Sequence, residues 1–134
     1  MCFGASGLRR QLISWFAALV FLMSFAVPAS AVDFLETIQD IPLPVGFVEL
    51  GDPVEFETPF GRIVETSAEG AGTIDQSIDY YKASLPAFGW ALVGGPLVFE
   101  RANERLYISV SQLDVVTHVD FKLVVRPASS KMND

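Results

Sequence analysis

Two carboxylates spaced for acid–base chemistry are the first candidates for a reactive site. Glu55 and Glu57 lie two residues apart in a stretch that alternates apolar and acidic side chains, residues 54–57. On a strand, both would project from one face, roughly 7 Å apart. Paired carboxylates near that separation hydrolyse glycosidic bonds when burial holds one of them protonated. The alternation predicts instead that both face solvent, so a polymer hydrolase is the third of three functional hypotheses.

The other chemically reactive side chains stand alone. His118 is the only histidine, and its neighbours on one face of the expected strand are Val116 and Asp120. A metal site needs further ligands, and a general base needs a nucleophile or an acid beside it. No Gly-x-Ser-x-Gly motif places a serine in an activating context. We therefore predict a surface histidine, no metal or other cofactor, and a protein that is not an enzyme.

Two glycines before a helix resemble the start of a phosphate-binding loop. Gly70 and Gly72 precede the expected helix, but Asp75 stands where the dinucleotide fingerprint has its third glycine. A carboxylate at that helix start would repel phosphate. We predict that this loop only leads into the helix.

Aromatic and basic side chains supply a candidate recognition surface. Tyrosine and tryptophan make large amphipathic contacts when they are exposed. Tyr81 and Phe88 share one helical stripe and are assigned to the core. A core or partly buried position also stays open for two of the remaining aromatics, Tyr80 and Trp90. The side chains predicted to line a partner or ligand surface are Tyr80, Trp90, Tyr107 and Lys122.

One helix must position these groups. Thr73 is its expected N-cap, and Gln76 three residues later completes a capping box. Pro86 would clash with a carbonyl of a regular helix, so the regular part is expected to end near Leu85. Apolar residues at spacings of three and four form its buried stripe. They are Ile74, Ile78, Tyr81, Leu85 and Phe88.

Short alternating segments surround this helix. Two precede it as a hairpin around a turn at residues 58–61, and four follow it. The order predicts an α+β fold, an antiparallel sheet of about five to six strands with one main helix packed on one face, preceded by a signal peptide helix. The other face of the sheet is left to solvent. The expected strands are residues 54–57, 62–68, 90–93, 97–101, 105–112 and 116–126.

The chain divides into four expected segments. Residues 1–31 are a signal peptide, 32–52 an extended lead-in, 53–127 the α+β domain and 128–134 a disordered tail. Pro42 and Pro44 each remove a backbone donor, so the lead-in is expected to be extended. Its apolar side chains should pack along the domain, namely Ile41, Leu43 and Phe47.

Residues 1–31 have the features of a cleaved export signal. Arg9 and Arg10 precede an apolar run over 12–27, and the small residues at 29–31 suit a signal peptidase. Cleavage before Val32 would place the protein in the periplasm or cell envelope. A retained anchor is the alternative, although the run is shorter than the about 20 residues that cross a bilayer. The paired arginines also resemble a twin-arginine signal, so the export route stays open.

Charge narrows the choice of partner. Without the two signal arginines, the chain keeps 16 acidic and 7 basic residues, a formal charge of −9. This charge disfavours nucleic acid and anionic lipid, and it favours solubility or a basic partner. Membrane contact is expected only through an uncleaved N-terminal segment. The only cysteine, Cys2, lies in the signal, so the exported chain would have no disulfide.

The helix and the strand after it carry a recurrent pattern. Tyr80 and Tyr81 are followed by Leu85 and then by the step from Gly89 to Trp90. This arrangement resembles small bacterial envelope domains with an aromatic-rich helix that ends in Leu-x3-Gly-Trp. The resemblance covers residues 54–126, implies a helix on a sheet, and implies no activity.

These observations leave three functional hypotheses. The first is an exported, non-enzymatic module that binds an envelope protein through the open sheet face or a sheet edge. The second is a carrier that holds a small apolar ligand between helix and sheet. The third is the envelope-polymer hydrolase. The carrier requires a cavity lined by Ile78, Tyr81, Phe99 and Phe121.

Overall fold

The computed structural model describes residues 31–128. The predicted signal peptide helix and the predicted tail from Ser129 onward lie outside the described residues. Within the described residues, none of the helices has the length and apolar character needed to cross a membrane. These residues belong to one compact unit that begins at Ala31.

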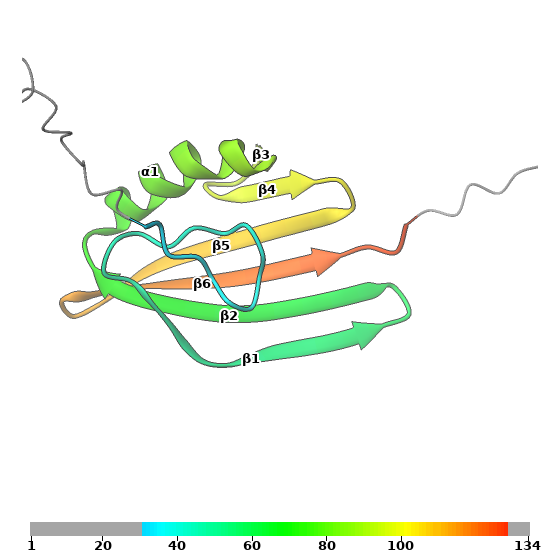
Figure 1. Cartoon of the computed structure of the whole chain (residues 1–134), viewed down its shortest axis with the longest axis horizontal. Coiled ribbons are helices and arrows are strands. Elements are labelled where there is room, and N and C mark those ends of the chain that lie inside the picture. The colour runs from blue at the N-terminus through cyan, green and yellow to red at the C-terminus, as the bar shows by residue number, and fades with distance from the viewer. Residues whose placement is uncertain (1–30, 129–134) are drawn as a thin grey trace, which may run out of the picture. The chain divides into compact units, whose positions relative to one another are not determined.

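Six antiparallel strands form one sheet, in the spatial order β1-β2-β6-β5-β4-β3 (Figure 1). This order confirms the predicted α+β class, an antiparallel sheet with one α-helix. The register is continuous over the three long central strands, where Val64 is opposite Leu123 and Leu106 is opposite Leu123. The strands are β1 Val48–Thr58, β2 Gly61–Ala71, β3 Ala91–Gly94, β4 Val98–Arg101, β5 Glu104–Leu113 and β6 Val116–Val125.

The helix α1 Ile74–Ser84 begins and ends where its sequence predicts. The Thr73 hydroxyl accepts from the Gln76 backbone, and the Gln76 side chain accepts from the Thr73 backbone. Pro86 lies in a 3-10 turn, η1 Leu85–Phe88, which Gly89 ends at a φ of +85°. Tyr81 and Leu85 are fully buried, as their stripe predicts.

Two details of the helix differ from the prediction. Ser77, which lies outside the predicted apolar stripe, is buried, whereas Ile74 of the stripe is 37% exposed. Local spacing predicts a stripe but not its rotation over the sheet.

A second element shares the covered face with α1. The N-terminal segment, residues 31–47, crosses in front of β5, β6 and β2 beside the helix (Figure 1). Its expected apolar contacts are present, since Ile41, Leu43 and Phe47 are buried, and Leu35 and Ile38 join them. These side chains share one core with the apolar faces of the sheet and helix.

This packing changes two predicted boundaries. Residues 32–52 are neither extended throughout nor a separate lead-in. Phe34 and Pro42 form an antiparallel bridge that folds the segment back on itself, its apolar side chains are core, and β1 begins at Val48. Strand β2 continues through the expected loop to Ala71, where Gly70 and Ala71 pair with β6. Gly70 permits this continuation, since a Cβ there would lie 2.4 Å from the Phe47 ring.

Glu49 joins the N-terminal segment to the first hairpin. Its carboxylate accepts from the Glu36 backbone N–H at 2.7 Å and from the Thr66 hydroxyl at 2.7 Å. Burial acts to raise the pKa of Glu49, but hydrogen bonds from Thr37, Thr66 and the Glu36 backbone outweigh it and hold the pKa below 4.5. The ionised form is therefore favoured by the folded state.

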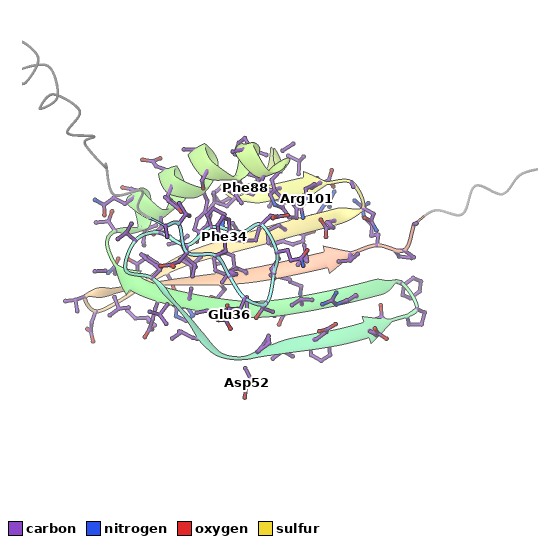
Figure 2. All side chains as sticks on the ribbon, in the orientation of Figure 1. Phe34, Glu36, Asp52, Phe88 and Arg101 are labelled. Carbon is purple, nitrogen blue, oxygen red and sulfur yellow. The ribbon has the colours of Figure 1, made fainter. Side chains whose placement is uncertain are left out.

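Arg101 of β4 contacts the N-terminal segment, η1 and β5. Its guanidinium donates to Asp40 of the N-terminal segment and to the Phe88 carbonyl of η1, both at 3.1 Å. It also pairs with Glu104 at 3.0 Å and lies 4.4 Å from the centre of the Trp90 ring. The ring of Phe34, in the N-terminal segment, meets that of Phe88 edge-on (Figure 2). The arginine therefore helps to hold the N-terminal segment against the helix end.

Arg101→Met is expected to lower the free energy of unfolding by about 2 kcal/mol, because it removes charge-assisted hydrogen bonds and the contact with Trp90. Urea unfolding measures this change. The matched control is Arg126→Met, which removes an exposed ion pair with Glu100 and should cost less than about 1 kcal/mol. Equal costs for the two variants would contradict the role assigned to Arg101.

Glu49→Gln is expected to weaken the dependence of stability on acid. A carboxyl with a lowered folded-state pKa stabilises the fold above its usual pKa near 4.5, and this contribution disappears as pH falls through the folded value. The free energy of unfolding should therefore fall more steeply between about pH 5 and about pH 3 for the native protein than for Glu49→Gln. Denaturant unfolding at each pH measures it. Glu57→Gln, which changes an exposed carboxylate, should keep the native slope.

Candidate functional site

The second face of the sheet has no covering element within residues 31–128. Cross-strand partners line up across it in transverse rows, because neighbouring strands keep one register. We call this surface the open face. Its central row runs through five strands, in the order Val98, Tyr107, Lys122, Glu65 and Val54.

The middle of the open face is polar and internally paired. Lys122 Nζ lies 3.1 Å from Glu65 Oε1. In the next row, Asp120 Oδ1 accepts from the Ser67 hydroxyl at 3.0 Å and lies 3.1 Å from His118 Nε2. These contacts pair Lys122 with Glu65 and fix the orientation of the side chains in both rows.

A groove of about 600 Å³ follows this polar centre. Apolar side chains from the outer strands stand at its two ends, Leu50 and Val54 from β1 and Val98 from β4. The mixture of paired polar groups and apolar ends is typical of a surface that recognises a partner. Its remaining lining includes Glu65, Ser67, Tyr107, Ser109, Asp120 and Lys122.

Ser67, Asp120 and His118 form a chain of contacts here, but not the arrangement that activates a serine as a nucleophile. Ser67 donates to the carboxylate of Asp120 rather than to the imidazole, so His118 is not placed to take its proton. His118 Nδ1 lies 3.9 Å from Glu69 Oε2, beyond hydrogen-bond distance. In the described part of the chain, no group of three or more histidine, cysteine, aspartate or glutamate side chains could hold a metal ion. The arrangement supports positioning and binding.

Two of the four predicted surface residues lie together on the open face. Tyr107 and Lys122 are direct cross-strand partners, and Tyr107 is 38% exposed. Tyr80 lies on the other side of the sheet, half-buried, where its hydroxyl donates to the Leu43 carbonyl at 3.0 Å. Burial raises the pKa of Tyr80 above its usual value.

Trp90 is a correction to the predicted surface. It is only 2% exposed, lies in the core and is covered by Arg101. The reason is that Gly89 turns the chain at a positive φ and delivers Trp90 to the covered face before β3 begins. The candidate surface therefore retains Tyr107 and Lys122 and loses Trp90.

The carboxylate pair on β1 is exposed at both positions. Glu57 is the cross-strand partner of Arg62, as the turn predicts, but the ion pair forms between Arg62 and Glu55. Neither glutamate is buried. The burial that would separate the roles of an acid and a base is therefore missing.

Sequence patterns missed the apolar character of the β1 surface. The alternation at residues 54–57 is typical of a half-buried strand, with Val54 and Phe56 inward. In the structure these side chains face the open side and are 47% and 52% exposed. Val48 and Phe60 are also exposed, at 64% and 84%. Only the placement of β1 at the sheet edge shows that nothing in the described part of the chain covers them.

The interface between helix and sheet is filled. Tyr81, Phe99 and Phe121 are at most 1% exposed, and the rings of Tyr81 and Phe121 meet edge-on at 5.6 Å. Of the four residues predicted to line a ligand cavity, Phe121 lines the groove on the open face, whereas Tyr81, Phe99 and Ile78 belong to the packed core or lie against it. This packing counts against a ligand cavity at the predicted place.

No family model, curated protein or solved structure matches this chain. The resemblance to envelope domains with a Leu-x3-Gly-Trp step therefore stays a prediction. The geometry of the sheet and its side chains is the basis for assigning a function.

Proposed function

We propose that this protein is an exported, non-enzymatic accessory module that binds a protein partner of the cell envelope. The observation that carries the proposal is the open face, with its groove of about 600 Å³ across five strands. Paired polar side chains occupy its centre, and exposed apolar side chains stand at its β1 end. A protein surface can use both kinds of contact over such a breadth.

The same features favour a macromolecule over a small apolar ligand. An apolar ligand is best held in a concave site that encloses most of its surface. The groove instead crosses the sheet over the ion pair of Lys122 with Glu65, and the interior between helix and sheet is packed. Export is supported by the basic start, apolar run and small residues of segment 1–31.

Light-induced crosslinking from the open face tests the partner. Tyr107→p-benzoylphenylalanine keeps an exposed aromatic ring at the centre of the groove. In cells that export the protein, this variant is expected to form an adduct with one dominant envelope protein. Gel electrophoresis and mass spectrometry of the envelope fraction identify it.

The matched control is Ala83→p-benzoylphenylalanine, which places the same group on an exposed position of α1. It should give no such adduct. If Tyr107→p-benzoylphenylalanine yields no protein adduct at equal expression, a partner on the open face is wrong. Native mass spectrometry would then seek a small bound ligand, the outcome that the carrier hypothesis predicts.

The exported form is expected to begin at Val32, because signal peptidases cut after small residues such as those at 29–31. N-terminal sequencing of protein from the envelope fraction measures this. A protein that begins at Met1 would show that the segment is retained. Recovery only from the cytoplasm would contradict export.

A further inference from the structure

The outer edge of β1 is unpaired within residues 31–128. β1 is the first strand of the sheet and pairs only with β2. Every residue from Gly51 to Phe60 is exposed, so the outer half of this strand is accessible from both faces as well as from its edge. An edge of this kind is where an extended segment of another chain can add as a further strand.

The edge has an apolar side. Side chains on one face of β1 share the open face with Glu65 and Ser67 of β2, their cross-strand partners. They form a row that ends in Phe56, which is 52% exposed. A strand added to β1 would place every second side chain beside this row. Its members are Val48, Leu50, Val54 and Phe56.

The opposite side of the same edge is acidic. A hollow of about 480 Å³ lies between the N-terminal segment and the first half of β1, and no lysine, arginine or histidine of the described residues lines it. Figure 2 shows Asp52 projecting outward at the β1 edge. Glu55 and Glu57 continue the acidic row, although Glu55 is already paired with Arg62. The carboxylates that line the hollow are Asp33, Glu36, Glu49 and Asp52.

Breaks in the ladder define which part of the edge is free. The register between β1 and β2 shifts between Leu50 and Val54, where Gly51 has a φ of +62°. Pro53 precedes the regular stretch, and Pro59 lies in the turn after it. The regular, exposed stretch is therefore residues 54–58, about the length of a typical short strand.

We propose that the regular stretch of β1 binds an extended segment of the partner whose side chains alternate between basic and apolar. The apolar side chains would lie beside Val54 and Phe56, and the basic ones beside Glu57 and the other carboxylates on the acidic side. The added segment becomes a seventh strand of the sheet. This inference rests on the proposed function and names the chemistry of the partner.

A second copy of this chain fits the edge poorly. Two β1 strands side by side would bring Glu55 and Glu57 of one copy against the same acids of the other. Like charges on directly opposed strands destabilise the pair. The formal charge of the full chain is −7, which adds to the repulsion between copies.

A synthetic octapeptide of alternating lysine and valine, acetylated and amidated, is the probe. A block peptide with four lysines followed by four valines has the same composition without the alternation. Fluorescence anisotropy with the purified exported protein is expected to show binding of the alternating peptide only. Hydrogen–deuterium exchange should slow at the backbone amides of residues 54–58, because the added strand protects them.

Matched charge reversals identify the edge. Glu57→Lys is expected to weaken binding of the alternating peptide by about tenfold. Asp79→Lys makes the same change in net charge at an exposed position of α1 and should leave binding unchanged. Circular dichroism checks that both variants fold.

Several results would overturn the inference. They are no binding at about 1 mM peptide, equal binding of the block peptide, native affinity in Glu57→Lys, and protection outside β1. A dimer in sedimentation that the peptide dissociates would replace the partner by a second copy. If the peptide experiments give these contrary results while Tyr107→p-benzoylphenylalanine still captures a protein, the proposed function stands and only binding at the β1 edge is wrong. If the peptide protects β1 but Tyr107→p-benzoylphenylalanine captures nothing, binding at the β1 edge stands and a partner on the open face is wrong.

Discussion

The fold depends on the N-terminal segment, because the single helix α1 is too small to cover one face of the six-stranded sheet. An 11-residue helix is about 16 Å long and about 10 Å wide, whereas six strands spaced about 4.8 Å apart form a wider surface. The N-terminal segment covers the part of the sheet that α1 leaves open, with Leu35, Ile38, Ile41, Leu43 and Phe47. Without this segment, the apolar side chains that lie beneath it would face water. The core is therefore built from three contributions, of which only two are regular structure.

Within the N-terminal segment, the short bridge between Phe34 and Pro42 supplies two backbone hydrogen bonds, so side-chain contacts with the rest of the domain must also hold the segment in place. The first are the carboxylate bonds of Glu49 to Glu36 and Thr66. The second are the bonds of Arg101 to Asp40 and the Phe88 carbonyl. Both sets join groups far apart in the sequence, which makes the segment part of the domain rather than a linker. They also explain why charged residues lie beside the core.

One covered face leaves the other face free for recognition. Paired polar side chains such as Lys122 and Glu65 let the centre of the open face contact water without a covering layer. Exposed apolar side chains lie along β1, at one edge of the sheet, and also on β3, at the other edge. The open face and the β1 edge therefore form one continuous surface, with apolar contacts on one side of the edge and carboxylates on the other. This continuity links the proposed function to the inference about the partner segment.

Local patterns were enough to predict the helix with its Thr73 cap and its end before Pro86, the turn at 58–61, and the alternation of β5 and β6. Each of these depends on backbone geometry within a few residues. The same alternation at 54–57 did not show that Val54 and Phe56 are exposed, nor did spacing show that Ser77 and Trp90 are buried. Tyr107 and Lys122 were predicted for the surface, but only the register made them neighbours. Burial is decided by what packs across from a side chain, and that partner comes from elsewhere in the sequence.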